Sequence, residues 1–494
     1  MPRSKFFTTL FVALIVGAGL WYMWMITSAK LEWGGASPGQ QQLGAVADTR
    51  HRAASQYCTG VVATPQGTWL VARLNGDAGQ VEASADVVDL DALVRGKSND
   101  EPEPVGSGAF AYLLSGREKE TSFISRLDAQ GQFQLVAHVS AAACLVASPD
   151  GASVLLLTGL DRPEAGSGDS VGQTVVFRSD DQGKRWTWLE QGWFPKADQV
   201  AWNLKPYFHG TDEVWAWGTP SGVDNENGED VPGAISTGVY YSADRGDHST
   251  PVMAAESLLV TSEYVRVKRP DVLQWHTDAG TYGDIRTHVI QLDPQRAFIW
   301  VSQRFWGSNP EGEGAHIAFN VTTRARLQRS TGQWQVVDTQ RDDKLFIAAL
   351  AQNADGRVAG LVDQEESGRH VIAELDTATL AWRPLGELPS VFAPLASQSR
   401  LREGHFYLGQ NSLLVNVTSE HRPPRWLYWW SDASICADGV FYSRDWGRSW
   451  QRLAIGGYLG ILGFQPTQDR VIWAKGNWYD NNDQGIYSYS LAQD

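Results

Sequence analysis

Short apolar segments separated by Gly- and Asp-rich turns recur from about residue 57 to the C-terminus. In one such pair, Phe123–Ser125 passes through a turn at 127–131 into Phe133–Val136. Apolar segments of this length, bounded by turn-forming residues, predict β-hairpins. Further hairpins of the same kind follow along the chain. The series starts at residues 123, 175, 239, 316, 371, 440 and 486.

Additional apolar strands lie between these hairpins, so each unit holds about four strands. One hairpin in every ~45–75 residues is typical of a β-propeller blade with loops of variable length. We predict seven blades, with six as the alternative. The final strand, Gly485–Tyr489, has no partner after it in sequence, which predicts that a strand near residues 57–74 closes the ring. Closure would remove the exposed edges that an open array leaves.

Composition supports an all-β chain. Its 494 residues include 49 Gly and 22 Trp but only 4 Met, and 20% are charged. Turn-forming and aromatic residues are abundant, as expected of a protein built from strands. The apolar fraction of 43% is large enough for a packed core, which excludes a disordered chain.

The N-terminus carries a pattern of its own. Arg3 and Lys5 precede an uncharged stretch, 6–29, in which Phe6–Ile26 is almost entirely apolar. A helix of that length spans a bilayer core of ~30 Å. We predict a cytoplasmic tip (1–5), a transmembrane anchor (6–29), a linker (30–54) and an exported propeller (55–494). A signal peptide cleaved near Thr27–Ala29 is the alternative.

Charge restricts the location and the partners. Positive residues before the anchor keep the N-terminus in the cytoplasm, which places the propeller in the periplasm of a bacterium with the anchor in its inner membrane. The formal net charge is −15. An acidic surface repels phosphate backbones, so we expect no nucleic-acid partner. Attachment to the membrane would depend on the anchor alone.

Two turns share the pattern S-x-D-x-G-x-x-W, and a third lacks only the Trp. This pattern resembles the Asp-box, or bacterial neuraminidase repeat, of sialidases, sortilin-type receptors and photosystem assembly factors, all of which are propellers. The resemblance implies a structural turn, in which Asp and Ser bond the loop backbone, Gly adopts a positive φ and Trp covers the sheet. It also implies that the turns lie on the outer part of the blades. The residues are Ser179, Asp181, Gly183 and Trp186; Ser242, Asp244 and Gly246; and Ser443, Asp445, Gly447 and Trp450.

The sialidase resemblance does not extend to catalytic residues. That family uses three arginines, a Tyr–Glu nucleophile pair and an Asp, and its first arginine sits in an Arg-Ile-Pro motif. The sequence has no such tripeptide, and the nearest basic strand residue is Arg73. We interpret the later candidates as solvated charges at strand ends. They are Glu263, Tyr264, Arg266 and Arg304. We therefore predict no catalytic site.

Other polar groups are open to two interpretations each. His276 and His288, with Asp278 and Asp284 between them, form either a metal cluster or surface polarity. The oxygen-rich turns 224–228 and 480–485 could hold Ca²⁺, but turn formation explains the same residues. We predict no metal and no cofactor.

Aromatic residues and cysteines raise two further questions. A dense aromatic run could stack on sugars or fill the core; it comprises Trp426, Tyr428, Trp429 and Trp430. The three cysteines, Cys58, Cys144 and Cys436, allow at most one bridge. We interpret each of them as a small buried apolar residue.

Three functions fit these observations. The first is a membrane-anchored, non-catalytic module that binds a protein partner, either as an assembly factor or as an immunity-type protein against a periplasmic effector. The second is a divergent sialidase-like exo-glycosidase. The third is a sortilin-like receptor in which Asn320 and Asn416 would accept glycans. That family, however, carries its anchor after the propeller and adds a Cys-rich module.

Overall fold

The structure is a computed structural model, and its description covers the strands and many of their connections. The described residues are 16–17, 19–24, 26–27, 41–46, 52–53, 61–75, 87–95, 120–139, 143–163, 170–189, 205–217, 223–224, 230–231, 238–271, 274–276, 285–308, 317–353, 355–363, 370–422, 434–453, 461–465, 469–474 and 485–491.

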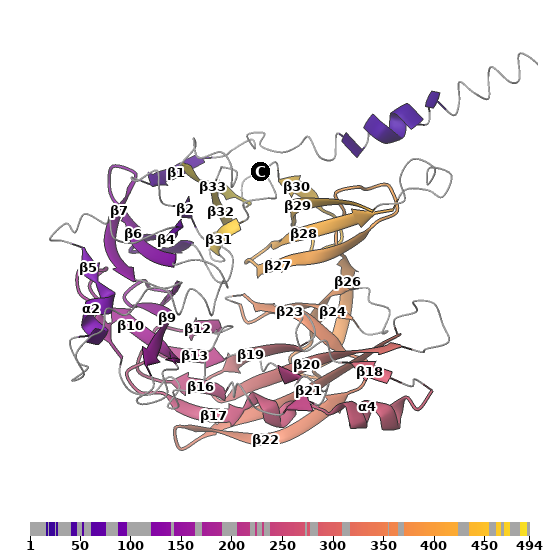
Figure 1. The fold of residues 1–494 in the computed structure, drawn as a ribbon, viewed down its shortest axis with the longest axis horizontal. Helices are drawn as coiled ribbons and strands as arrows, with labels where there is room; N and C mark the ends of the chain where they lie inside the picture. The colour runs from indigo at the N-terminus through magenta and orange to yellow at the C-terminus, as the bar shows by residue number, and fades with distance from the viewer. Residues whose placement is uncertain are drawn as a thin grey trace, which may run out of the picture.

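Seven blades of four main antiparallel strands form a ring (Figure 1), and blades 1 and 7 are hydrogen-bonded to each other as one ten-stranded sheet. Blades 1 to 3 are built, from the innermost strand outwards, by β3 (Val61–Thr64), β4 (Gly67–Asn75), β6 (Glu120–Leu127) and β7 (Gln132–Val139); β8 (Ala143–Ala147), β9 (Val154–Pro163), β10 (Ser170–Ser179) and β11 (Thr187–Trp188); and β12 (Lys205–His209), β13 (Glu213–Trp217), β16 (Gly238–Ser242) and β17 (Thr250–Ala254).

Blades 4 to 6 repeat this order. Their strands are β19 (Ile285–Asp293), β20 (Arg296–Ser308), β21 (Ile317–Ser330) and β22 (Gln333–Asp342); β23 (Phe346–Gln352), β24 (Val358–Asp363), β25 (Val371–Leu375) and β26 (Trp382–Glu387); and β27 (Gln398–Leu408), β28 (Leu413–His421), β29 (Ile435–Ser443) and β30 (Gln451–Leu453). The predicted all-β propeller of seven blades is confirmed.

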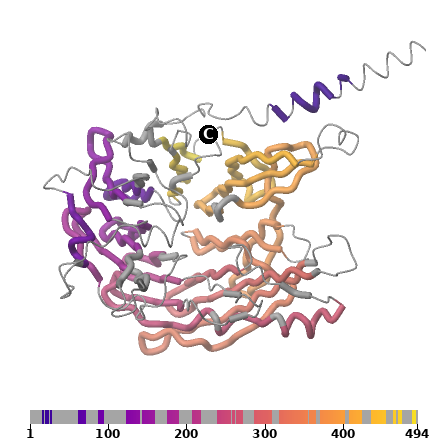
Figure 2. Tube along the Cα trace, in the orientation of Figure 1, coloured from indigo at the N-terminus to yellow at the C-terminus, as the bar shows by residue number. Residues whose placement is uncertain are grey.

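Blade 7 joins the two ends of the chain. It contains β31 (Ile461–Gln465), β32 (Arg470–Ala474), β33 (Gly485–Ser490) and, as its fourth strand, β1 (Gln41–Val46), which pairs antiparallel with β33. Figure 1 shows β1 beside β33, and Figure 2 shows the indigo strands at the start of blade 1 next to the yellow C-terminal strands. The prediction that a strand near residues 57–74 closes the ring is wrong, because β3 and β4 start blade 1 instead. The closing strand lies within 30–54, the range predicted as a linker.

Smaller elements decorate the blades. Blade 1 carries β2 (Arg52–Ala53) beside β4, and β5 (Val88–Asp89) beside β7, with α2 (Leu90–Arg95) after β5. The remaining elements are β14 (Val223–Asp224), β15 (Asp230–Val231), the 3-10 helix η1 (Ala255–Leu258), α4 (Ser262–Lys268) and β18 (Gln274–His276), which pairs with the end of β20.

The core consists of apolar layers between neighbouring blades. Alternate residues of one strand enter different layers, as the pleat requires. In β9, Val154 and Leu156 pack with blade 1, whereas Leu155 and Leu157 pack with blade 3. Because both faces of a blade are covered, its central strands read as nearly continuous apolar runs.

The two faces of the ring differ in the length of their connections. The turns between first and second strands and between third and fourth strands are short, and the longest are 180–186, 243–249 and 444–450. We call this side the turn face. The opposite side, the loop face, carries the longer connections, such as 76–119 and 255–284.

Most of the predicted transmembrane span lies outside the described residues. Helical residues occur at 16–17, 19–24 and 26–27, which we call the N-terminal helix. Among the residues that the structure describes, none belongs to a helix with the length and apolar character needed to cross a membrane.

Candidate functional site

The three predicted turns join the third and fourth strands of blades 2, 3 and 6. In blade 6, the Ser443 hydroxyl donates to Asp445 at 2.8 Å and accepts the amide of Gly447 at 2.7 Å. The Asp445 carboxylate accepts the amide of Ser449 at 2.8 Å. Gly447 has φ +89°, a conformation that favours glycine. The side chains of Ser443 and Asp445 are therefore bonded within the turn.

The turns of blades 2 and 3 have the same geometry. The Ser179 hydroxyl accepts the amide of Gly183 at 2.8 Å, and the Ser242 hydroxyl accepts that of Gly246 at the same distance. Asp181 and Asp244 each accept the backbone amide four residues later, at 2.8 and 2.9 Å. Trp186 is 6% exposed and packs against Trp69 of blade 1, and Trp450 donates to the carbonyl of Glu387 in blade 5.

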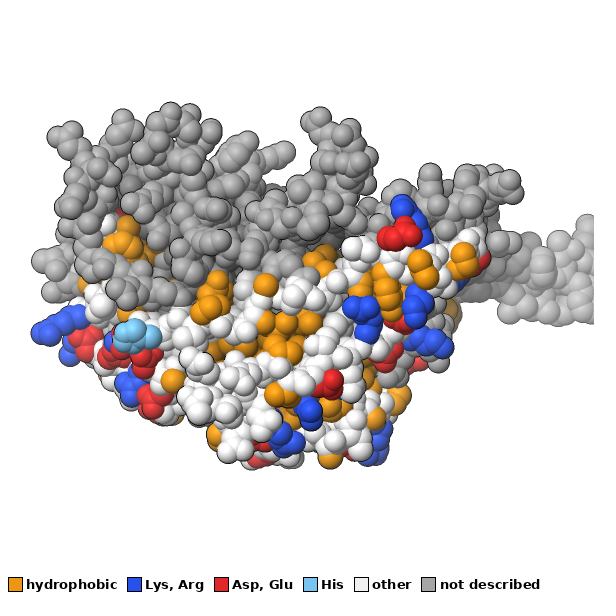
Figure 3. All heavy atoms as spheres, turned by 90° about the horizontal axis from the view of Figure 1, so that it is seen from below, with side chains coloured by type: hydrophobic (Ala, Val, Ile, Leu, Met, Phe, Trp, Pro, Cys, Tyr) orange, Lys and Arg blue, Asp and Glu red, His pale blue; other side chains and the backbone are white. Residues whose placement is uncertain are grey.

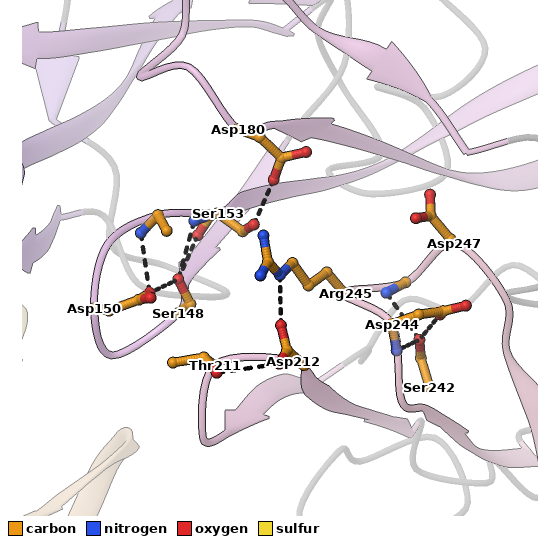
Figure 4. Close-up of polar contacts among 12 residues, drawn as sticks. Ser148, Asp150, Ser153, Asp180, Thr211, Asp212, Ser242, Asp244, Arg245 and Asp247 are labelled. Carbon is orange, nitrogen blue, oxygen red and sulfur yellow. Dashed lines mark hydrogen bonds and ion pairs between the residues drawn. The ribbon is translucent and has the colours of Figure 1, made fainter.

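Ion pairs within and between blades 2 and 3 surround these turns. Arg245 donates to Asp212 at 2.6 Å within blade 3 (Figure 4). Arg178 of blade 2 pairs with Asp180 at 2.9 Å and reaches Asp247 of blade 3 at 2.7 Å. Each charged side chain of this cluster therefore has a partner of opposite sign within the protein.

Hydrogen bonding also explains the acidity of the turn carboxylates. The hydroxyl of Ser449, followed by its amide and the hydroxyl of Ser443, lowers the pKa of Asp445 to about 2. Burial opposes ionisation of Asp244, but bonds from the amide and ring of His248 outweigh it and lower the pKa of Asp244.

The loop face between blades 4 and 5 holds a different kind of polar cluster. Arg304, near the end of β20, is 7% exposed and donates to Asp363 at 2.7 Å and to Asn320 at 2.9 Å. Its guanidinium lies over the ring of Phe346 at 4.4 Å. Asp363 is fully buried, so the pair is removed from water and held by packing.

Two buried nitrogen atoms beside this pair have no hydrogen-bond partner. They are Nε2 of His370 and Nδ2 of Asn320. Burial, and then repulsion from Arg304, lowers the pKa of His370 to about 4, although Asp363 acts in the opposite direction. His370 is therefore neutral at pH 7, with a buried ring nitrogen that accepts or donates no hydrogen bond. We call Arg304, Asn320, Asp363 and His370 the loop-face cluster.

The other candidates from the sialidase comparison are engaged elsewhere. Tyr264 of α4 donates its hydroxyl to Asp343 at 2.7 Å. Glu263 lies on the exposed side of the same helix, where it pairs with Arg266 at 3.4 Å. The structure does not bring these residues into the loop-face cluster. The side chain of Arg73 lies outside the described residues.

The proposed histidine–aspartate cluster is not assembled among the described residues. His288 is buried, and its Nε2 lies 3.1 Å from the carbonyl oxygen of Ile347 in the next blade. Asp278, Asp284 and the side chain of His276 lie outside the described residues. So do the aromatic run at 426–430 and most of the turns 224–228 and 480–485.

The glycan acceptors proposed for a sortilin-like receptor are not accessible. Asn320 and Asn416 both have 0% exposure, inside blades 4 and 6. A glycan on either side chain would not fit in the folded ring. This finding removes the reason for that alternative.

The interpretation of the cysteines as buried apolar residues needs correction. Cys144 of β8 is disulfide-bonded. Cys436 of β29 is free and exposed. Cys58 lies outside the described residues. The positions of the three cysteines in the sequence gave no indication of which of them would form a disulfide.

One group of possible metal ligands was not found from sequence. Asp89, Asp91 and His138 place one ligand atom each within 4.8 Å of one another on the outer edge of blade 1. Parallel pairing of β5 with β7 sets Asp89 beside His138. Such contacts between distant segments have no local sequence signal.

Comparisons with known proteins identify no family. No family model matches the sequence, and no curated protein is significantly similar to it. Among solved structures, a GH74 xyloglucanase from Xanthomonas campestris is 14% identical with a TM-score of 0.41, covering 92% of this chain and 54% of that one. An oligogalacturonate lyase from Vibrio parahaemolyticus is 9% identical with a TM-score of 0.41, covering 92% and 93%.

A third structure is the acylaminoacyl peptidase of Pyrococcus horikoshii. It is 10% identical with a TM-score of 0.41, and the alignment covers 85% of this chain and 49% of that one. The chain thus spans about half the length of the xyloglucanase and of the peptidase. At these identities and TM-scores the likeness carries nothing about substrate, and the propeller assignment rests on strand pairing.

Proposed function

We propose that the protein is a non-catalytic binding propeller, anchored by its N-terminal segment at the outer face of a bacterial inner membrane. Its ligand is a protein in the periplasm, and the loop face makes the contact. An assembly role and an immunity-type role against a periplasmic effector both fit this description.

The state of Arg304 carries the proposal. A sialidase-type site needs guanidinium groups that are free to bind the substrate carboxylate. Arg304 is instead neutralised by Asp363, bonded to Asn320 and buried on Phe346. Tyr264 is likewise bonded to Asp343 rather than to a glutamate. Among the described residues, the candidates named from sequence all take part in contacts of the fold.

The disulfide at Cys144 supports an exported location. Disulfides persist in oxidising compartments such as the periplasm and are rare in the cytosol. The uncharged N-terminal stretch supports the anchor, since 6–29 contains no Asp, Glu, Lys or Arg.

Two measurements on the full-length protein test the proposal. We expect no hydrolysis of aryl sialosides or other aryl glycosides. We also expect one envelope protein to co-purify from native membranes, and its recovery to fall at least tenfold with Lys344→Glu on the loop face. The matched variant Lys184→Glu, on the turn face, should leave recovery unchanged; both lysines are exposed.

Turnover that disappears when an arginine or tyrosine of the loop face is replaced would reject the non-catalytic function. Equal loss of the partner from both lysine variants would reject the loop face as the contact surface.

A further inference from the structure

The N-terminal helix packs against the ring at blade 6. Tyr22 and Ile26 are each only 7% exposed, and they contact Leu395 and Ile435. The two residues are four apart, which places them on one side of a helix. Figure 1 shows the indigo helix leading away from the ring beside β28, β29 and β30.

His421 is the polar centre of this contact. Its Nδ1 lies 2.7 Å from the carbonyl oxygen of Ala396, so Nδ1 carries the proton and donates. Nε2 then accepts the Tyr22 hydroxyl at 3.0 Å, in a buried bond. Phe392 packs on the other side of the imidazole, with ring centroids 5.7 Å apart. The propeller thus provides a buried hydrogen-bond acceptor and an aromatic surface for Tyr22. We call this contact the Tyr22 seat.

This seat belongs to the loop face. His421 ends β28, Ile435 begins β29, and Leu395 lies between β26 and β27. All three positions are at the ends of strands that meet the longer connections. The helix therefore contacts the side of the ring that lies opposite the turns of Ser443 and Asp445.

The rest of the helix surface is apolar and exposed. Eight large hydrophobic side chains are exposed among the described residues, and five of them lie in this helix: Val16, Leu20, Trp21, Met23 and Trp24. The other three are Val267, Val336 and Val337. On the rim seen in Figure 3, charged side chains of both signs lie among the hydrophobic ones.

The length of the segment determines where Tyr22 lies relative to a bilayer. If the proposed anchor is helical from Phe6, Tyr22 lies 16 residues or ~24 Å along it, which is close to the ~30 Å of a hydrocarbon core. Trp21 and Trp24 are at the depth where Trp residues are enriched, between hydrocarbon and water. A ring held at Tyr22 has no spacer that could separate it from the lipid.

We propose that the loop face of blade 6 lies directly on the lipid bilayer, and that the Tyr22–His421 contact fixes this orientation. The inference rests on the proposed anchor. It means that the turn face points away from the membrane and that a partner reaches the loop face from the side, close to the lipid surface.

Energy transfer to lipid tests the orientation. The full-length chain, with Cys436→Ser, is placed in nanodiscs whose headgroups carry an acceptor dye. A donor is attached at Arg422→Cys on the loop face or at Arg448→Cys on the turn face of the same blade; both positions are exposed. We expect at least twofold higher transfer from position 422. Tyr22→Ala, which leaves the core of the ring intact, should reduce this difference while the protein stays in the nanodisc.

Each other outcome contradicts the proposal. Equal transfer from both positions, with the protein retained in nanodiscs, would reject the orientation and leave the anchor valid. Failure to enter nanodiscs would reject the anchor and the orientation together. Transfer between two labelled rings that rises with protein concentration would show that the exposed helix face binds a second copy instead of lipid.

Discussion

The blade 6 turn and the loop-face cluster differ in how their polar side chains are hydrogen-bonded. On the turn face, Ser443 and Asp445 complete their hydrogen bonds within one short turn. On the loop face between blades 4 and 5, Arg304 and Asp363 bond across two blades and lie beside His370, whose buried Nε2 is unpaired. The blade 6 turn is self-sufficient, whereas the loop-face cluster leaves buried polar atoms without a partner; the contrast does not extend to every turn, since Ser249 Oγ in the turn 243–249 is also buried without one.

This difference indicates which face is constrained by folding alone. A turn whose donors and acceptors are all matched stabilises the blade and needs nothing else. An unpaired buried nitrogen costs free energy, and such violations are concentrated at functional sites. The comparison therefore favours the loop-face cluster over the blade 6 turn as a binding site.

Breaking the buried ion pair should have the largest effect. Arg304→Met leaves the Asp363 carboxylate buried without its partner, and we expect a loss of ~3–5 kcal/mol in unfolding free energy. Denaturant unfolding of the purified protein measures it. The double variant with Asp363→Leu should recover most of the loss, because no uncompensated charge remains. A loss below ~1 kcal/mol in the single variant would show that the pair is not desolvated.

The disulfide should rank next. Cys144 lies near the loop-face end of the innermost strand of blade 2. Cys144→Ser should lower the unfolding free energy by ~2–4 kcal/mol, since it releases a constraint on the unfolded chain. Reduction of the unchanged protein should have the same effect. Cys436→Ser is the control, because that thiol is free and exposed. A reductant-sensitive Cys144→Ser variant would contradict the assignment.

The same comparison shows which features are predictable from sequence. The turns were found because Ser, Asp and Gly stand two residues apart, within a single loop. The blades were found because runs such as Val154–Leu157 are apolar on both faces. The closing strand, Gln41–Val46, begins with two glutamines and contains a Gly, so its sequence resembles a linker.

The loop-face cluster could not be predicted from local sequence patterns. Arg304 and Asp363 are 59 residues apart, and their contact arises only when two blades pack. The sequence predicted Arg304 to be a solvated charge at a strand end. Its position near the end of β20 is correct, but the predicted solvation is wrong, because Arg304 is only 7% exposed. The seat of Tyr22 on His421 joins residues that are 399 apart.

The unfolding free energy should depend on pH in a different range for each face. The pKa of His370 is lowered to about 4 in the folded protein, below the ordinary value of ~6.5. The unfolded chain therefore binds a proton first as pH falls, and the folded state loses stability between about pH 6.5 and pH 4. We expect a loss of ~2 kcal/mol at pH 5 from this group. His370→Asn should remove that part of the pH profile. An unchanged profile would show that the imidazole is solvated.

The smallest effect should come from the turn of blade 6. Asp445→Asn keeps the shape of the side chain but weakens its charge-assisted bonds to Ser449, and we expect a loss of ~1–2 kcal/mol in unfolding free energy at pH 7. Arg448→Ala, three residues away and exposed, should change the unfolding free energy by less than ~0.5 kcal/mol.

The stability contribution of this turn depends on pH in a lower range than that of His370. The folded pKa of Asp445, about 2, lies below the unfolded value of ~3.9, so its contribution is present above pH 4 and disappears as pH falls from 4 to 2. Asp445→Asn should flatten the stability profile only in that window, and His370→Asn only above it. Partner recovery at pH 7 should survive Asp445→Asn, because the proposed contact is made by the loop face. Loss of the partner in a folded Asp445→Asn protein would end the distinction between a structural face and a binding face.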